Sequence, residues 1–212
     1  MPHVPQSPTT ALRVLTFDEA LVPSPDAAYD RSRWLYVPDF YSEYRYILGT
    51  RGTRPLIAVG INPSTAAPDA LDNTLKSVER IALANGYDCF WMFNVYAQRA
   101  TDPDHMEPAL NPVLHRENLR AFSYLLDLAR GVSGAVPDVW AAWGTILLKR
   151  AYLPGCVRDM ASLGQKAGAR WFTCGPRSKN GGHPHHPLYL RRDARLDPFD
   201  VEAYLASLPG EK

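Results

Sequence analysis

A buried strand that runs into a polar loop and then into a helix most constrains how this chain can fold. Residues 56–59 read Leu-Ile-Ala-Val, an apolar run typical of a strand buried on both faces. Gly60 and Pro63 end that strand, and the pattern predicts a helix over residues 73–84. Since a strand, loop and helix in this order are typical of parallel α/β folds, the loop is expected at the carboxyl edge of a sheet, where such folds bind ligands.

The same alternation continues along the chain. Three further buried strands are predicted at residues 90–95, 139–143 and 170–174, with helices between them. The predicted fold is therefore α/β, a three-layer α/β/α sandwich with a central, mostly parallel, four-stranded sheet. Residues 1–30, rich in Pro, Ser, Thr and Ala, are expected to form a loosely ordered N-terminal arm, and residues 31–212 a single α/β domain.

The segment before the first of these strands is less regular. Residues 44–48 and 56–59 flank a glycine-containing connection, which predicts a hairpin. Residues 33–46 are dense in aromatic side chains. They are expected to pack over a sheet edge, and a base-stacking surface is the alternative.

Charge and cysteine content exclude several classes of protein. The formal net charge of the 212 residues is +1, so no global basic field indicates nucleic-acid binding, and any such binding needs a local patch. The three cysteines are widely spaced without a Cys-x-x-Cys pair, as expected in a reducing compartment. Neither a membrane-length apolar run nor a secretory signal is visible. We expect a cytoplasmic monomer with no membrane partner.

Polar loops follow four predicted strands, at residues 62–65, 94–99, 143–145 and 179–186. In a parallel sheet all four lie at the same carboxyl edge, so residues more than a hundred positions apart are predicted to converge on one cleft. Lys179 belongs to a local basic cluster able to hold phosphate. The candidate ligand-binding residues are Asn62, Ser64, Thr65, Asn94, Tyr96, Arg99, Trp143, Lys179, His183 and His186.

Other nucleotide and catalytic motifs are absent. The sequence contains neither a dinucleotide fingerprint nor a P-loop, and it lacks the Gly-x-Ser-x-Gly elbow of the α/β-hydrolases. The loop at 183–187 holds three histidines, but His185 and His186 are adjacent and point in different directions, with no carboxylate or second cysteine alongside. We therefore predict no metal site and no cofactor.

These loops carry a family resemblance. The matching stretches are residues 60–66 (GINPSTA), 93–103 (FNVYAQRATDP) and 179–190 (KNGGHPHHPLYL), with 72–74 and 142–144. In these stretches the chain resembles a bacterial family catalogued as domain of unknown function 1643. The resemblance spans roughly residues 44–190. The family name supplies no activity.

The same landmarks look like those of the uracil-DNA glycosylase superfamily, whose fold is also a three-layer α/β/α sandwich with a four-stranded parallel sheet. That resemblance implies that Asn62 positions the hydrolytic water, that Asn94 reads a pyrimidine edge, and that His186 lies over the sugar and the departing base. Asp72 is expected to cap the following helix, and activation of the water is its alternative role.

The implied function is hydrolysis of the N-glycosidic bond of a damaged or modified base in DNA. The alternatives are a non-catalytic module that binds a nucleotide or a nucleic-acid base, and an enzyme acting on a free nucleoside or a modified RNA base. The chain departs from the superfamily where asparagine replaces the acidic activator of water and where the iron–sulfur cysteines are missing. Tyr96 and Trp143 are candidates for the aromatic that stacks on the base.

Overall fold

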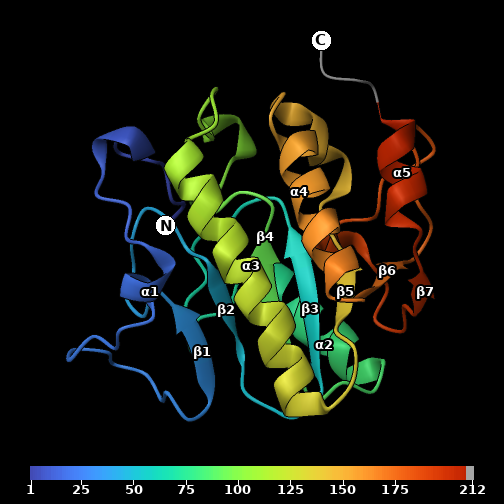
Figure 1. Ribbon diagram of the computed structural model, residues 1–212, viewed down its shortest axis with the longest axis horizontal. Helices are drawn as coiled ribbons and strands as arrows, with labels where there is room; N and C mark the ends of the chain where they lie inside the picture. Colours follow the sequence, from blue (N-terminus) through green and yellow to red (C-terminus); the bar gives the residue numbers. More distant parts are fainter. Residues whose placement is uncertain (209–212) are drawn as a thin grey trace.

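Seven strands form one mixed sheet in the computed structural model, which describes residues 1–208 (Figure 1). Their order across the sheet is β1-β2-β4-β3-β5-β6-β7. The inner strands β4, β3, β5 and β6 run parallel to one another, whereas β1, β2 and β7 are antiparallel to their neighbours. The strands span Trp34–Val37 (β1), Ile47–Thr50 (β2), Pro55–Gly60 (β3), Cys89–Asn94 (β4), Asp138–Ala141 (β5), Arg170–Cys174 (β6) and Leu196–Pro198 (β7).

Helices cover both faces of this sheet (Figure 1). One apolar cluster packs α1, α3, α4 and α5 against one face, and a second cluster packs α2 against the other. The helices span Phe17–Ala20 (α1), Asn73–Ala84 (α2), Pro112–Ser133 (α3), Leu153–Lys166 (α4) and Val201–Ser207 (α5), and short 3-10 turns span Thr9–Ala11 (η1), Pro103–His105 (η2), Gly144–Lys149 (η3) and Pro187–Tyr189 (η4).

The α/β class is confirmed, but the prediction of four strands is wrong. The four predicted parallel strands lie at the centre, and three antiparallel strands extend the sheet on both sides. β1 lies in the aromatic segment that was expected only to pack over an edge. β7 contains Pro198, which lacks an N–H donor and is tolerated because β7 is an edge strand.

The predicted hairpin is also wrong. β2 pairs with β1 and with β4, so β4 lies between β2 and β3. The glycine-containing connection therefore crosses the end of the sheet instead of closing a hairpin. The glycine at position 49 is explained by the close approach of β4, because a Cβ at Gly49 would lie 2.1 Å from the carbonyl oxygen of Phe90 on that strand.

The β3–α2 unit matches the sequence pattern closely. Asp72 precedes the helix, and its side chain accepts a hydrogen bond from the Leu75 N–H at 2.9 Å. Leu75, Val78 and Ile81 recur at helical spacing and are buried against the sheet. This geometry places the N-terminus of α2 beside the carboxyl ends of β3 and β4.

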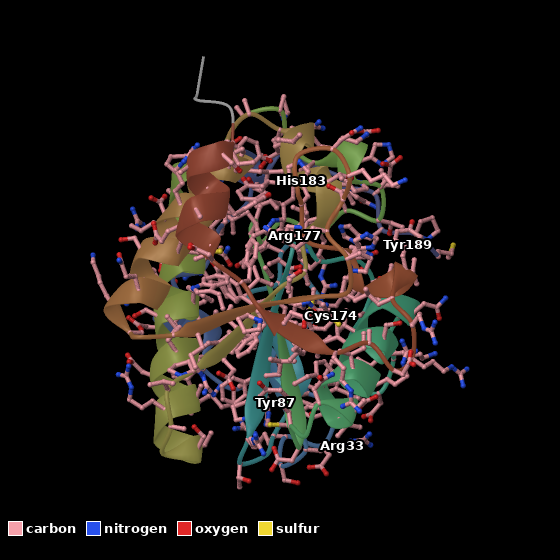
Figure 2. All side chains as sticks on the ribbon, turned by 90° about the vertical axis from the view of Figure 1, so that its right-hand side faces the viewer. Arg33, Tyr87, Cys174, Arg177, His183 and Tyr189 are labelled. Atoms are coloured by element: carbon pink, nitrogen blue, oxygen red, sulfur yellow. The ribbon has the colours of Figure 1, made fainter. Side chains whose placement is uncertain are left out.

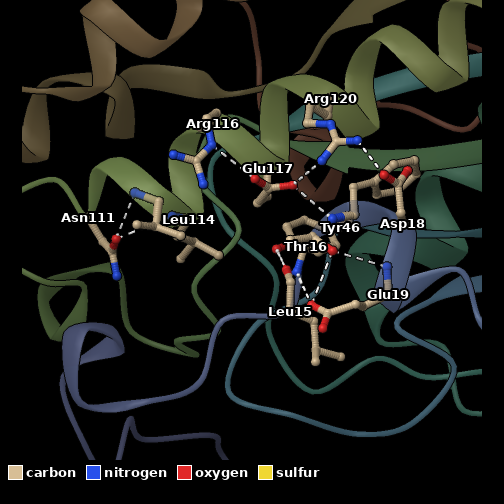
Figure 3. A network of polar contacts seen from close by, with 12 residues as sticks. Leu15, Thr16, Asp18, Glu19, Tyr46, Asn111, Leu114, Arg116, Glu117 and Arg120 are labelled. Atoms are coloured by element: carbon tan, nitrogen blue, oxygen red, sulfur yellow. Dashed lines mark hydrogen bonds and ion pairs between the residues drawn. The ribbon is translucent and has the colours of Figure 1, made fainter.

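The N-terminal segment runs along α3 (Figure 3). Thr16 and Glu19 form a capping box at the start of α1. The buried carboxylate of Glu117 on α3 accepts a hydrogen bond from the Phe17 N–H at 2.9 Å and pairs with Arg120 at 3.0 Å. The contact with Glu117 ties the middle of residues 1–30 to α3, and the division into an arm and a domain stays a prediction.

Candidate functional site

A cavity of about 390 Å³ opens at the carboxyl ends of β3 and β4. That volume lies within the range of small-molecule sites. Its walls come from Arg45 just upstream of β2, the loop after β3, the start of α2, the end of β4, residues 100–103, η3, and the start of η4 with the preceding His186. The structure brings six of the predicted residues to it: Asn62, Ser64, Thr65, Asp72, Asn94 and His186.

A larger hollow, of about 570 Å³, lies between β6, β7 and α5. None of the predicted site residues lines it. We place the candidate site in the smaller cavity because polar side chains from distant parts of the sequence converge there.

Parallel pairing of β3 with β4 brings the first two polar loops together. Gly60 at the end of β3 is the register partner of Asn94 at the end of β4. A Cβ at Gly60 would lie 2.5 Å from the Met92 Cε and 3.2 Å from the Asn94 Oδ1. The absence of a side chain at Gly60 therefore leaves the Asn94 amide room beside the cavity.

Asn94 is an unpaired buried amide. The residue is 1% exposed, and neither Oδ1 nor Nδ2 has a hydrogen-bond partner among residues 1–208. Its backbone carbonyl is satisfied, because the Asn118 Nδ2 donates to it at 2.9 Å. A buried polar group without a partner costs about 1–3 kcal/mol, so this side chain is suited to a ligand that supplies both a donor and an acceptor.

Asn62 is held in a single orientation. Its Nδ2 donates to the carbonyl oxygens of Pro63 at 3.1 Å and of Ala100 at 2.7 Å. Both amide hydrogens are thereby occupied, and the Oδ1 has no protein partner within residues 1–208. The side chain therefore offers an acceptor to the cavity.

Asp72 combines a structural contact with a place in the cavity wall. One carboxylate oxygen, Oδ1, caps α2 through the Leu75 N–H. The other oxygen makes no hydrogen bond within the described part of the chain, so it is available to a water molecule or a ligand.

His186 is the N-cap residue of η4 and is partly buried at the cavity. Burial lowers the pKa of its imidazole, and the negative charge of Asp72 opposes this with a smaller effect. The ring is therefore neutral near pH 7. Its Nδ1 faces the Leu188 N–H at 3.4 Å, an acceptor position, which leaves the proton on Nε2.

Gly144 lets the backbone after β5 approach His186 closely. It has a φ of +64°, and a Cβ there would lie 3.4 Å from the His186 Cβ. The Trp-Gly-Thr loop after β5 thus contributes a close backbone approach, and only Gly adopts that φ readily.

Three predicted residues belong to hydrogen-bond networks outside the cavity lining. The Tyr96 hydroxyl lies 2.9 Å from Glu107 Oε2 and accepts from the Asn111 N–H. The Trp143 Nε1 donates to the Tyr204 hydroxyl at 3.3 Å, and that hydroxyl lies 2.7 Å from the His183 Nδ1. Tyr96, Trp143 and His183 are all buried, so neither aromatic is placed to stack on a base in this cavity.

The two remaining predicted residues differ in exposure. Arg99 is fully buried, where it binds the Ser64 and Ala66 carbonyls and supports the loop after β3 from behind. Lys179 is exposed and does not line the cavity. Tyr189, which was not predicted, is 76% exposed, packs its ring against His186 and projects from the surface (Figure 2).

Arg45 is a cavity residue that the sequence-based prediction missed. It is 1% exposed and lines the cavity, and its Nη1 donates to the Ala66 carbonyl at 3.1 Å. Burial, followed by the charge of Arg99, lowers the pKa of Arg45 to about 9. The signal was present in the sequence, since Arg45 is a lone charge within the apolar and aromatic run Tyr-Arg-Tyr-Ile-Leu.

The fold and the cavity define an α/β protein with a polar, ligand-sized hollow at the carboxyl edge of its parallel strands. The chain belongs to the family described as "Protein of unknown function (DUF1643)", whose model matches residues 45–188. Every residue that lines the cavity, from Arg45 to Leu188, falls within that span. No curated protein and no solved structure matches the chain.

Two further findings concern residues 1–208. No group of three or more His, Cys, Asp and Glu side chains there is arranged to hold a metal ion. None of the helices in that part of the chain has the length and apolar character needed to span a bilayer.

Proposed function

We propose that the cavity binds a nucleobase and that the chain hydrolyses the N-glycosidic bond between that base and its sugar. The observation that carries the proposal is the unpaired, buried amide of Asn94 in the same cavity as Asn62, Asp72 and His186. An amide pairs with the edge of a base through one donor and one acceptor, as in direct readout of nucleic acids. The resemblance of these motifs to those of the uracil-DNA glycosylases, from which the roles of Asn62, Asn94 and His186 were expected, is in line with the proposal.

The first half of the reaction needs a positioned water. The free Oδ1 of Asn62 accepts one hydrogen of that water. The carboxylate oxygen of Asp72 that does not cap α2 accepts the other. The water oxygen bonds to C1′ of the sugar as the C1′–N bond breaks, and the bonding electron pair leaves with the base. The water proton passes to the carboxylate of Asp72. The base departs as an anion and then takes a proton from solvent, and Asp72 returns its proton to solvent.

The second half needs stabilisation of the charge on the departing base. A neutral His186 with its proton on Nε2 donates a hydrogen bond without adding a charge that must be desolvated. Donors aimed at developing charge are worth about 10²–10³ in rate. The exposed side chains of Leu188 and Tyr189 lie next to this histidine in the chain, where they would contact whatever enters the mouth.

Release of free base tests the proposal directly. At high enzyme concentration, chromatography would follow base release from oligonucleotides carrying uracil, hypoxanthine or mismatched thymine, and from free nucleosides and nucleotides. We expect release from at least one substrate and its loss in Asn62→Ala. Binding without release from any substrate would contradict the hydrolase and leave the non-catalytic binding module as the function.

Asp72→Asn separates capping from catalysis. Asn is as good an N-cap as Asp, so the free energy of unfolding should change by less than about 0.5 kcal/mol. The rate should fall about 10²–10⁴-fold, because an amide takes no proton from water near neutral pH. Base-release rates and denaturant unfolding measure the two effects.

Asp200→Asn is the matched control for that substitution. Asp200 caps α5 through the Ala203 N–H at 2.9 Å, the same role as Asp72, but it does not line the cavity. The control should leave the rate unchanged. An equal rate for Asp72→Asn and wild type would remove Asp72 from the mechanism.

A further inference from the structure

Two arginines lie side by side in the interior next to the cavity. Arg45 is 1% exposed and Arg99 is fully buried. Both donate to the same carbonyl oxygen, that of Ala66, at 3.1 Å from the Arg45 Nη1 and 3.3 Å from the Arg99 Nη1. Two like charges on one acceptor repel each other, and burial removes the water that would screen them.

Neither guanidinium has a counter-ion. Among residues 1–208, no carboxylate forms an ion pair with Arg45 or Arg99, and the Nε of each is buried without a partner. Arg99 is partly compensated, because its Nη2 donates to the Tyr36 hydroxyl at 2.9 Å and its guanidinium lies 4.2 Å from the Tyr41 ring centroid. Within the described part of the chain, the guanidinium of Arg45 has the shared Ala66 carbonyl as its one hydrogen-bond acceptor.

Asp72 is the carboxylate whose charge acts on Arg45 across the cavity. One carboxylate against two guanidiniums leaves a net positive charge beside the cavity, since burial keeps His186 neutral. Buried charges are normally paired, so an anionic ligand is the partner that this arrangement lacks.

We propose that Arg45, backed by Arg99, is an anion subsite of the cavity, and that the ligand is a nucleoside monophosphate whose phosphate binds there. The inference rests on the proposed function for the base, which pairs with Asn94. The hydroxyls of Thr65 and Thr74 also line the cavity, and neither forms a hydrogen bond within residues 1–208, so both are free to donate to phosphate oxygens.

Depth favours a terminal phosphate over a phosphate within a polymer. Because Arg45 is almost fully buried, a phosphate must enter the cavity to reach it. A diester carries chain on both sides and stays at the surface, whereas a monoester ends the ligand. The small net charge of the chain, +1, likewise provides no broad field for a polyanion.

Binding to the intact chain tests this subsite. We would measure thermal unfolding in inorganic phosphate against chloride at equal ionic strength, and calorimetric affinities of the common nucleoside 5′-monophosphates, of their nucleosides, and of a short oligonucleotide. Phosphate should raise the melting temperature. At least one monophosphate should bind about 10–100-fold more tightly than its nucleoside and more tightly than the oligonucleotide.

Arg45→Gln should remove both the phosphate effect and the preference for the monophosphate. The control is Arg177→Gln, which makes the same change of charge at an exposed residue outside this cavity and should keep both. The wild-type comparison of nucleotide with nucleoside stands even where the Arg45 variant fails to fold.

Equal affinity for nucleoside and monophosphate, or tighter binding of the oligonucleotide, would overturn the subsite. The two proposals fail separately. Phosphate-dependent binding without release of base would contradict the hydrolase and keep the subsite. Release of base at the same rate from nucleoside and nucleotide would contradict the subsite and keep the hydrolase.

Discussion

Asn94→Leu is expected to abolish recognition of the base while making the empty protein more stable. The substitution removes a buried amide that has no partner, so the free energy of unfolding should rise by about 1–2 kcal/mol. The same amide is the proposed reader of the base edge, so kcat/KM should fall on the order of 100-fold or more. Denaturant unfolding and base release measure the two effects on one protein sample.

The matched control is the same substitution at Asn118, which contacts Asn94. Asn118 is also fully buried, but its Nδ2 donates to the carbonyls of Asn94 at 2.9 Å and Val95 at 3.2 Å. Asn118→Leu leaves both carbonyls without this donor and should destabilise the protein by about 1–3 kcal/mol. If Asn94→Leu destabilises the protein to the same degree, the Asn94 amide is structural and the cavity loses its reader.

The parts of the fold that the sequence predicts are those fixed by local pattern. A continuous apolar run followed by Gly60, then a helix with apolar residues at helical spacing, has few alternatives to a buried strand and a covering helix. The edge strands β1 and β7 lack such a pattern. β1 lies in an aromatic segment whose side chains also suit a packing surface. β7 is three residues long and contains a proline, so only its pairing with β6 defines it as a strand.

The residues of the candidate site also divide into those that local pattern predicts and those that it does not. Asn62, Asn94 and His186 could be brought together from sequence because parallel strands end at one edge, whatever the loops do in detail. The lone charge of Arg45 was visible in the sequence, but its place at the cavity was not, because that place depends on β2 lying beside β4 and the sequence pattern favoured a hairpin with β3. The aromatic candidates Tyr96 and Trp143 lie in polar loops, but their large rings are buried in the core and do not reach the cavity.

Buried polar atoms without a partner also occur in the core, at Trp140, Trp171 and Thr173. Among the described residues, Asn94 is the one with two such side-chain atoms, and it lines the cavity together with Arg45, whose Nε is also unpaired. Local departures of this kind, in a chain otherwise consistent with its fold, are typical of functional sites.

His186→Ala is expected to lower the rate of base release about 10²–10³-fold, because it removes the donor to the departing base. In the wild type, kcat/KM should fall as pH drops through the pKa of His186, which burial holds below its ordinary value of 6.5. A proton on Nδ1 ends the hydrogen bond from the Leu188 N–H that orients the ring. The unfolded chain binds a proton on this residue at a higher pH than the folded chain does. The histidine therefore makes folding less favourable as pH falls from about 6.5, and it has no such effect above that pH.

The neighbouring residue, His185, provides the control for the fall in kcat/KM at low pH, the acid limb of the pH profile. His185 is partly buried beside His186 but does not line the cavity, so His185→Ala should keep both the rate and its acid limb. His186→Ala should lose the part of the limb that belongs to imidazole, and the unfolding free energy of that variant should depend less on pH between 5 and 7. A rate of base release in His186→Ala equal to that of the wild type would contradict the role of His186 as the group that stabilises the departing base.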